Sequence, residues 1–467
     1  MAQQSISSGE TGDETGWPLL KSERNWGQWE LWAVLLVAAA ATWCYIIGGY
    51  VGYYLDMKRG FAAMTAGSMI GMLLVTLAVV PCATRYGIDS IASSRPQFGS
   101  RGTIIPVFLQ YVSIIGWNSL LLIFFGKAVD QFLVTVGIIS ESAGHIIVPV
   151  AAVFACAIVF VVLLRGATGL ERVSKVLFFF IVGVGLWIVY ELMTGKSADI
   201  AAATPQYASG NPVWDYTTGI EIGIASLVSW WPYIGAMVRV SPNAHAATLP
   251  SMLGMGLPVP ILSVIGLAAM LALQDSDPST WLVQLGGSFY GAIALLFVIA
   301  ANFGTALAGL YASAVGLKQV PGVNRLSWQV TLLLGLAPVA FVSVFLPDLF
   351  FNSFGNFLAF IGVFFSPLCA IQIVDYLILR RQKIDIRAVY DGAPGTSYYY
   401  WAGFNPAAIL AMVAGFFTYI YLLNPITYVS NSPYEFLTAS LPTAVVGGVA
   451  YWLVTMLLVR PARRGGY

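Results

Sequence analysis

Charged residues are scarce in this 467-residue sequence, at 9% of the chain, where an ordinary soluble domain has roughly 25%. This scarcity excludes a water-soluble globular protein. The net charge of +1, without a basic patch beyond the loops, argues against a nucleic-acid partner. No loop is long enough to bury a core of its own. The composition therefore predicts a polytopic membrane protein whose surroundings are lipid.

Groups that carry covalent chemistry are also few. The four cysteines fall in apolar stretches without metal-ligand spacing. The two histidines, His145 and His245, fall in loops expected on opposite sides of the membrane. No phosphate-binding loop and no nucleophile stands out. The sequence predicts a protein that is not an enzyme and has no resident cofactor.

Hydrophobic residues, by contrast, make up 58% of the chain, and they gather in segments near the roughly 20 residues that cross a membrane. The sequence predicts twelve spans, at about 30–54, 62–84, 103–126, 146–164, 174–194, 217–238, 248–273, 285–316, 326–347, 351–379, 403–423 and 436–459. With the N-terminus inside, 18 of the 22 Lys and Arg residues fall on the cytoplasmic side. We therefore expect a multi-pass protein of the cell membrane with both termini in the cytoplasm.

The segments outside the spans are short. Residues 1–29 are polar and acidic without a signal-peptide pattern, and we expect them to form a disordered cytoplasmic tail. Residues 460–467 form the second tail. The loop at 85–102 is expected to be a connector that sets topology and contacts lipid.

The stretch at 219–242 is apolar enough to cross a membrane but poorly suited to one continuous helix. It contains Ser229, a Trp230 and Trp231 pair, and then Pro232. Proline lacks the N–H and clashes with the preceding turn, so the helix is expected to break just before it. A broken helix is tolerated in lipid only where its backbone is buried in protein or lines a watery cavity, as in many transporters. A plain kink with space-filling aromatics is the alternative.

Span three supplies the candidate substrate contacts. Trp117 lies near its centre, next to Asn118, whose amide offers a donor and an acceptor together. A planar ligand stacked between Trp117 and Trp230 or Trp231 gains about 0.5–1.5 kcal/mol per aromatic pair beyond area burial. The alternative is that Asn118 makes an interhelical hydrogen bond, worth about 0.6 kcal/mol.

Spans one and eight supply the candidate cation contacts. Span one is softened by small residues at 38–41, and span eight carries Asn302 and Thr305. Oxygen atoms are the ligands that a hard cation prefers. A Thr305 hydroxyl beside free carbonyls of span one predicts a sodium site. The alternative is a threonine bonded to its own backbone four residues back.

Few ionisable residues lie near the spans. Lys127 and Glu221 both lie toward the outer side, and a structural pair between them is expected. Asp375 precedes the basic run at 380–383 and is expected to form an ion pair or a cap at the interface.

Six pieces of the sequence resemble the nucleobase:cation symporter family, which includes cytosine, purine, uracil, allantoin and hydantoin permeases. They are RYGIDSIASSRPQFGSRGTIIP (85–106), GWNS (116–119), SWWPYIGAMVRVSP (229–242), LYAS (310–313), VDYLILRRQKIDIRAVY (374–390) and GFNPAAILA (403–411). They occur in order over nearly the whole chain, and the ending of span ten is the most specific.

The resemblance implies an all-α membrane protein with a leucine-transporter-like fold. Two inverted five-helix repeats, at 30–194 and 217–379, would be followed by two additional helices at 403–459. It also implies alternating access around a site near the middle of the membrane.

The resemblance further assigns site residues. Trp117 matches the family's stacking tryptophan, and Trp230 the aromatic of span six, with Trp231 as the competing assignment. Val37 and Ala40 match carbonyl ligands of sodium, and Thr305 matches one of two hydroxyl ligands. Gly304 replaces the other hydroxyl, which weakens the case for sodium.

The sequence thus predicts a secondary transporter that imports a nucleobase or related planar nitrogen heterocycle with a cation. Substrate contacts are expected from Trp117, Trp230 or Trp231, Asn118 and Asn302. A transporter of the same fold for an amino acid or other zwitterion is the first alternative, and a sensor or channel is a remote one. No feature of the sequence sets an oligomeric state.

Overall fold

The computed structural model describes residues 16–275 and 277–467, and every regular element within them is a helix. The helices are α1 (Gln28–Ala39), α2 (Thr42–Gly52), α3 (Met57–Tyr86), α4 (Ser90–Phe98), α5 (Ile104–Thr135), α6 (Gly144–Leu163), α7 (Gly166–Gly195), α8 (Ser197–Ala202), α9 (Pro212–Val228), α10 (Trp231–Val238), α11 (Ala244–Gly256), α12 (Pro258–Leu273), α13 (Pro278–Leu317), α14 (Trp328–Phe345), α15 (Pro347–Asn352), α16 (Phe354–Ile373), α17 (Ile386–Tyr390), α18 (Pro406–Leu422), α19 (Tyr434–Leu437) and α20 (Ser440–Val454). Wider π-type turns extend α16 over Val374–Leu379 and α20 over Thr455–Val459.

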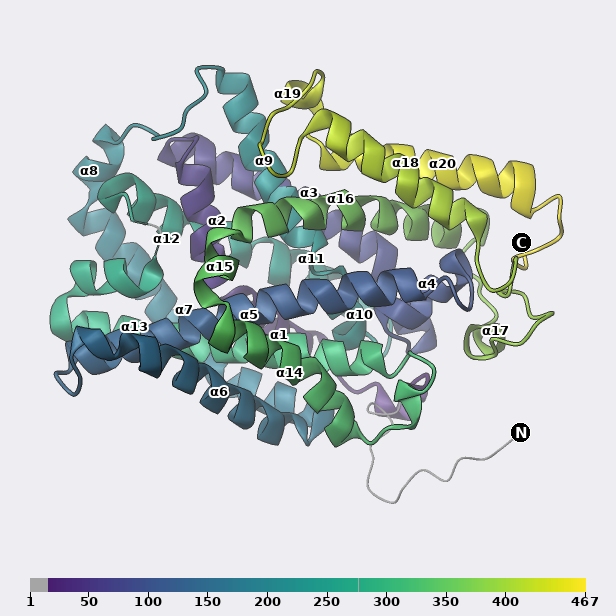
Figure 1. Cartoon of the computed structure of the whole chain (residues 1–467), viewed down its shortest axis with the longest axis horizontal. Coiled ribbons are helices and arrows are strands. Elements are labelled where there is room, and N and C mark those ends of the chain that lie inside the picture. The colour runs from purple at the N-terminus through teal and green to yellow at the C-terminus, as the bar shows by residue number, and fades with distance from the viewer. Residues whose placement is uncertain (1–15, 276) are drawn as a thin grey trace.

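The helices form an elongated bundle, and α5, α16, α18 and α20 run along its long axis (Figure 1). In the described part of the chain, nine helices are long and apolar enough to span a membrane, and the bent pair α1–α2 makes a tenth. The other two expected spans correspond to the broken pair α9–α10 and to α18, which has 17 residues. The helices are therefore consistent with the twelve predicted spans.

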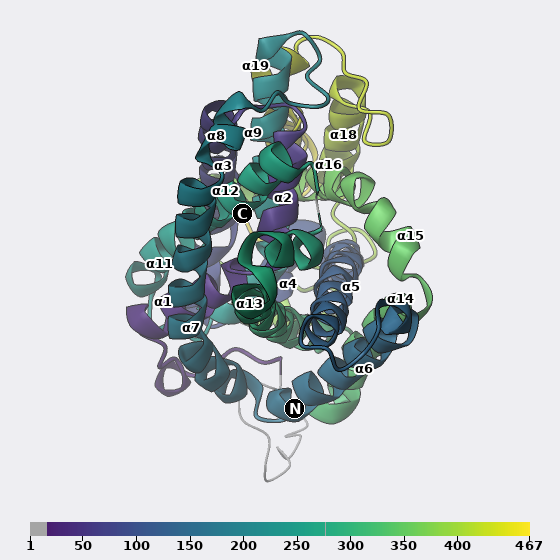
Figure 2. The same ribbon diagram turned by 90° about the vertical axis from the view of Figure 1, so that its left-hand side faces the viewer.

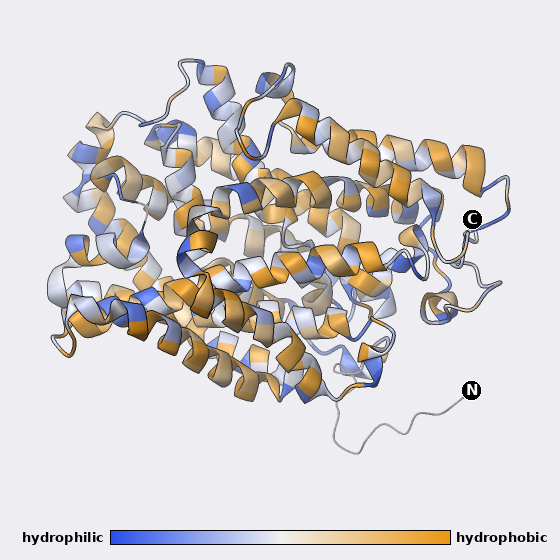
Figure 3. Ribbon diagram, in the orientation of Figure 1, coloured by the Kyte–Doolittle hydropathy of each residue, from blue (hydrophilic) through white to orange (hydrophobic). Residues whose placement is uncertain are grey.

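The outer surface of the bundle is apolar. Large hydrophobic side chains stay exposed along α6, α7, α14, α18 and α20, and Figure 3 shows these hydrophobic faces in orange, most plainly on α6, α18 and α20. Because such a surface is costly in water and favourable in lipid, it fits a protein embedded in a bilayer.

The first predicted span is broken in its middle. α1 and α2 meet at an angle of 53°, and the two residues between them leave helical geometry, with Ala41 fully extended. Asn302 of α13 stabilises the restart, because its Oδ1 accepts hydrogen bonds from the Thr42 backbone N–H at 3.2 Å and from the Thr42 hydroxyl at 2.6 Å. The predicted soft centre of this span is confirmed.

The sixth predicted span is also broken. α9 ends at Val228, and α10 restarts at Trp231 with Pro232 in its first turn, where the missing N–H of proline costs nothing. The predicted break before Pro232 is therefore confirmed. The two breaks are at corresponding places in the two expected repeats, as an inverted-repeat transporter requires.

The loop at 85–102 folds inward instead of lying against lipid. It contains α4, most of whose side chains are buried. The Ser90 hydroxyl donates to the Trp231 carbonyl at 2.6 Å, and a Cβ on Gly235 would lie 2.3 Å from the Ser90 nitrogen. α4 thus packs directly on α10, and the expectation of a lipid-contacting connector is wrong.

The segment before α1 is also packed. Residues 1–15 lie outside the described part, so the predicted tail is described only from Gly16 onward. Leu19 and Trp26 are buried, the Gln319 amide donates to the Gly16 carbonyl at 2.7 Å, and Trp17 stacks on Tyr390 with ring centroids 5.0 Å apart. The prediction of a disordered tail is wrong for residues 16–29, because they make specific contacts with the helix bundle.

Two ion-pair predictions have different outcomes. Lys127 pairs with Asp277 at 2.8 Å, not with Glu221. Glu221 instead accepts hydrogen bonds from the start of α20, including the Ser440 N–H at 2.9 Å. Asp375 forms the predicted ion pair, with Arg380 at 2.6 Å, but the pair is fully buried.

Candidate functional site

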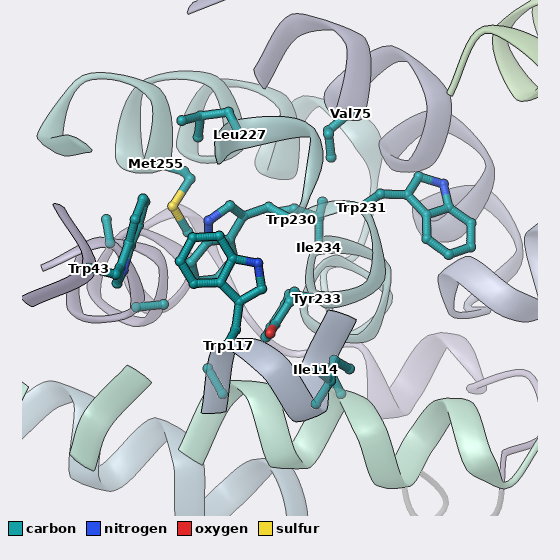
Figure 4. Close-up of a cluster of buried hydrophobic side chains, with 14 of the residues drawn as sticks. Trp43, Val75, Ile114, Trp117, Leu227, Trp230, Trp231, Tyr233, Ile234 and Met255 are labelled. Atoms are coloured by element: carbon teal, nitrogen blue, oxygen red, sulfur yellow. The ribbon is translucent and has the colours of Figure 1, made fainter. Parts of the chain in front are cut away.

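Three tryptophans from three helices meet beside the two helix breaks. Trp117 comes from the middle of α5, Trp230 from the break between α9 and α10, and Trp43 from the first turn of α2 (Figure 4). The Trp43 ring lies 5.5 Å from Trp117, nearly edge-on at 72°, and 5.8 Å from Trp230, tilted by 42°. Only Trp117 and Trp230 were expected here.

Further aromatic rings extend this cluster. Tyr233 of α10 lies 4.7 Å from Trp230, and Phe354 and Phe357 of α16 contact Trp117 edge-on at 5.2 and 5.9 Å. All are centroid separations within the favourable range for aromatic pairs. We call Trp43, Trp117, Trp230, Tyr233, Phe354 and Phe357 the aromatic cluster. It joins helices of both expected repeats, because α2 and α5 belong to the first and α10 and α16 to the second.

Buried polar atoms in the cluster lack partners. The indole N–H groups of Trp43 and Trp117 and the Oδ1 of Asn118 make no hydrogen bond within the described residues. The Asn118 amide nitrogen donates to its own helix, to the Ile114 carbonyl at 2.7 Å. Since buried polar groups are nearly always paired in folded proteins, unpaired ones at a single place indicate a ligand site.

Trp230 and Trp231 point in different directions. Trp230 faces Trp43, whereas Trp231 is turned away toward α16 (Figure 4). There the Trp231 indole donates to the Gln372 amide oxygen at 2.5 Å and the ring packs on Phe365. The structure therefore brings Trp230 to the aromatic cluster and gives Trp231 a place between helices.

The Asn302 side chain contacts the start of α2 through its oxygen, and its amide nitrogen has no partner within the described residues. Its side-chain oxygen is used at the start of α2, where it receives both Thr42 bonds described above. This contact places Asn302 as the capping residue of the first break. Sequence reasoning could not separate this role from substrate contact, because both require an amide on the same face of α13.

The predicted cation residues come together only in part. The Thr305 hydroxyl lies 3.3 Å from the Val37 carbonyl, 3.1 Å from the Ala38 carbonyl and 3.1 Å from the Ala301 carbonyl of its own helix. Ala38 was not among the expected ligands. Ala40 lies in the break itself, and Thr305 makes no hydrogen bond to it.

Gly304 removes one expected oxygen ligand from the candidate cation site. A Cβ at position 304 would lie 2.7 Å from Cγ1 of Val37 and 3.0 Å from Cδ1 of Leu177. Apolar groups therefore stand where a second hydroxyl ligand was expected. The remaining oxygens are one hydroxyl and neighbouring backbone carbonyls, all neutral. Such a donor set suits a monovalent cation, and the described residues hold no cluster of three His, Cys, Asp or Glu side chains for a transition metal.

A helical membrane bundle with two spans broken in their middles, and aromatic side chains gathered at the breaks, defines a secondary transporter. Sequence comparison gives the family. Residues 18–453 match the family described as permeases for cytosine/purines, uracil, thiamine and allantoin. The match covers most of the chain, so the protein belongs to this permease family, as its motifs predicted. It is a transport protein and not an enzyme.

Relatives and solved structures agree. The chain is 23% identical to a purine-uracil permease of Arabidopsis thaliana, over 92% of this chain and 75% of the relative. It is 25% identical to a hydantoin permease of Microbacterium maritypicum, over 86% and 83%. The structure of Mhp1, a nucleobase-cation-symport-1 family transporter with bromovinylhydantoin bound, covers 95% of both chains with a TM-score of 0.76 at 21% identity. This likeness confirms the predicted leucine-transporter-like fold.

Proposed function

We propose that this permease imports a small planar nitrogen heterocycle together with a cation, by alternating access around the aromatic cluster. One observation carries the proposal: Trp117 and Trp230 both contact Trp43 beside the two helix breaks, close to buried polar atoms without partners. In this proposal the two indole faces hold the ring of the substrate and Asn118 bonds its edge. The relatives' names, purine-uracil permease and hydantoin permease, support the same class of substrate.

The surroundings of the cluster favour a neutral substrate over a zwitterion. Two of the buried carboxylates, Glu221 and Asp375, are bound at sites away from the cluster: Glu221 at the start of α20, and Asp375 to Arg380. The cluster itself presents aromatic faces and indole donors, and Asn118, next to Trp117 in the chain, adds an amide. A zwitterion needs opposite charges or helix ends to balance both of its ionic groups, so an amino acid fits this site less well.

We infer sodium as the coupling cation, held at Thr305 and the carbonyls of Val37 and Ala38. The contacts of the Thr305 hydroxyl support this assignment, since those carbonyls belong to the end of α1, where the helix loses its own hydrogen bonds. Gly304 removes one oxygen, so we expect a lower sodium affinity than two hydroxyl ligands would give.

The orientation of the protein in the membrane is proposed from the distribution of charged residues in its loops. We infer that both termini lie in the cytoplasm of a cell-membrane protein, because Lys and Arg are in excess in the loops on the termini's side. Contacts of Gly16 with Gln319 and of Arg380 with the Gly465 carbonyl support a common side, because they join both ends of the chain to the same end of the bundle.

Uptake by the purified protein in proteoliposomes tests the function. The labelled solutes are uracil, hypoxanthine, hydantoin and leucine, with an inward gradient of sodium or of choline. We expect accumulation of at least one heterocycle, and more of it with sodium. Accumulation of leucine alone would overturn the substrate class, and equal accumulation in both gradients would overturn sodium coupling.

A further inference from the structure

Trp43 is the member of the aromatic cluster that no motif assigned. It follows the break between α1 and α2 directly, so its position is set by the same Asn302 contact that restarts the helix at Thr42. Its ring touches both tryptophans of the proposed site and is almost fully buried, at 1% exposure. A side chain of this size, in contact with both proposed stacking rings, limits what can enter between them.

The Trp43 indole N–H is buried and has no acceptor within the described residues. Several other indole N–H groups have acceptors: Trp26 donates to Glu171, Trp231 to Gln372, and Trp328 to the Leu163 carbonyl. Among the described side chains, the buried indole nitrogens without a partner are those of Trp43 and Trp117, and both lie in the aromatic cluster.

An unpaired buried N–H destabilises a protein unless something accepts from it. Indole nitrogen can only donate, so the missing partner must be an acceptor. Two such donors lie on adjacent rings, and Asn118 adds an unpaired oxygen close by in sequence to Trp117. The complement of this pattern is a planar ring with carbonyl oxygens and a ring N–H.

Resting on the proposed function, we infer that Trp43 is a specificity-determining residue that donates a hydrogen bond to a ring carbonyl oxygen of the substrate. The substrates are accordingly oxo-heterocycles, in which the acceptor is a C=O group, and not heterocycles that carry amino groups alone. The ring of Trp43 at the same time forms the third wall of the site, next to Trp117 and Trp230.

The test compares oxo and thio ligands, because sulfur accepts hydrogen bonds more weakly than oxygen. Dissociation constants are measured on the purified full chain for three sets: uracil with 2- and 4-thiouracil, hydantoin with 2- and 4-thiohydantoin, and hypoxanthine with 6-thiohypoxanthine. Adenine serves as the amino ligand. In the wild type, at least one oxo ligand should bind more tightly than its thio analogue.

Trp43→Phe keeps a ring and removes the N–H. It should weaken binding of the oxo ligand by roughly three- to tenfold, which corresponds to the free energy of one hydrogen bond. The affinity for the oxo ligand should then be near that for the thio analogue. Trp328→Phe is the matched control, because it removes a buried indole N–H of α14 that donates to the Leu163 carbonyl of α6, and it should leave the oxo-to-thio ratio unchanged.

Two results would overturn the inference: an unchanged oxo-to-thio ratio in Trp43→Phe, whether or not both affinities fall, or adenine as the only wild-type ligand. If Trp43→Phe does not fold, the wild type alone decides, because wild-type protein that binds every thio analogue as tightly as its oxo parent overturns the inference as well. The proposed function fails separately: in that case neither the wild type nor Trp43→Phe binds any heterocycle.

Discussion

Two buried polar regions of this protein differ in how far their polar atoms are hydrogen-bonded within the protein. At the end of the bundle near the C-terminus, Asp375 receives hydrogen bonds from Gln97, Arg380, Tyr451 and Tyr467. In the aromatic cluster and at Asn118, which follows Trp117 in the chain, the Trp43 and Trp117 N–H groups and the Asn118 oxygen have no partner among the described residues. Both regions are buried to a similar degree. The difference lies in whether the protein satisfies its own polar atoms.

That difference distinguishes a region that stabilises the fold from a region that binds a ligand. A buried carboxylate bonded by several side chains fixes helices relative to one another, here α4, the end of α16 and α20. An unpaired set costs free energy unless a ligand completes it. The comparison predicts that changes at the C-terminal network act on stability, whereas changes at the aromatic cluster act on binding.

Trp117→Ala should have the largest effect on transport. The substitution removes one of the two faces that hold the substrate ring, so uptake should be abolished while expression and folding persist. Uptake of the best heterocycle in proteoliposomes measures it. Trp231→Phe is the control: it loses the bond to Gln372 outside the cluster and should retain uptake. Unchanged transport by Trp117→Ala would contradict the proposed stacking.

Asp375→Asn should have the largest effect on stability. It leaves the Arg380 charge buried without its counter-ion, which destabilises proteins by about 3–5 kcal/mol. Asp56→Asn is the matched control, because Asp56 pairs with Arg59 on the surface, where such pairs contribute about 0–1 kcal/mol. Unfolding temperatures in detergent compare them, and equal shifts would contradict the assigned role of the network.

An oxygen added at position 304 should strengthen sodium coupling. The double variant Gly304→Ser with Val37→Ala provides a hydroxyl and removes the methyl group that a Cβ there would meet at 2.7 Å. We expect half-maximal uptake at a several-fold lower sodium concentration. Gly304→Ala with Val37→Ala has the same packing without the oxygen. If both double variants respond to sodium alike, position 304 does not face the cation.

The smallest effect is expected at the half-buried pair Lys127 and Asp277. A double-mutant cycle of Lys127→Met and Asp277→Asn should give a coupling free energy below about 1 kcal/mol, since both side chains reach water. The cycle of Lys127→Met with Glu221→Gln should give none. A measurable coupling to Glu221 would restore the pairing expected from the sequence.

The sequence predicted features that depend on composition along one chain segment. Span positions follow from apolar length, and the break before Pro232 follows from the missing proline N–H. Trp117 and Trp230 were assigned by family motifs, and the structure places both in the aromatic cluster. These features can be predicted without knowing how the helices are rotated against each other.

Contacts that depend on how the helices rotate and pack could not be predicted from the sequence. Lys127 meets Asp277 and not Glu221, and residues 16–29 pack on the bundle, only because distant segments converge there. Figure 2 shows that helices far apart in the sequence lie side by side, such as α5 and α13. Trp43 did carry a signal: it follows the soft centre of span one as Trp230 lies at the break of span six.

The most direct measurement is the thermal stability of the purified protein with and without ligand, for the wild type and Trp117→Ala. The panel contains nucleobases, hydantoins, allantoin and amino acids, each in sodium and in choline buffer. A ligand at 100 times its dissociation constant adds about 2.7 kcal/mol to the folded state. We predict that an oxo-heterocycle stabilises the wild type, more in sodium, and leaves Trp117→Ala unchanged. Stabilisation by amino acids alone, or equal stabilisation of Trp117→Ala, would contradict the assignment of the aromatic cluster as the substrate site.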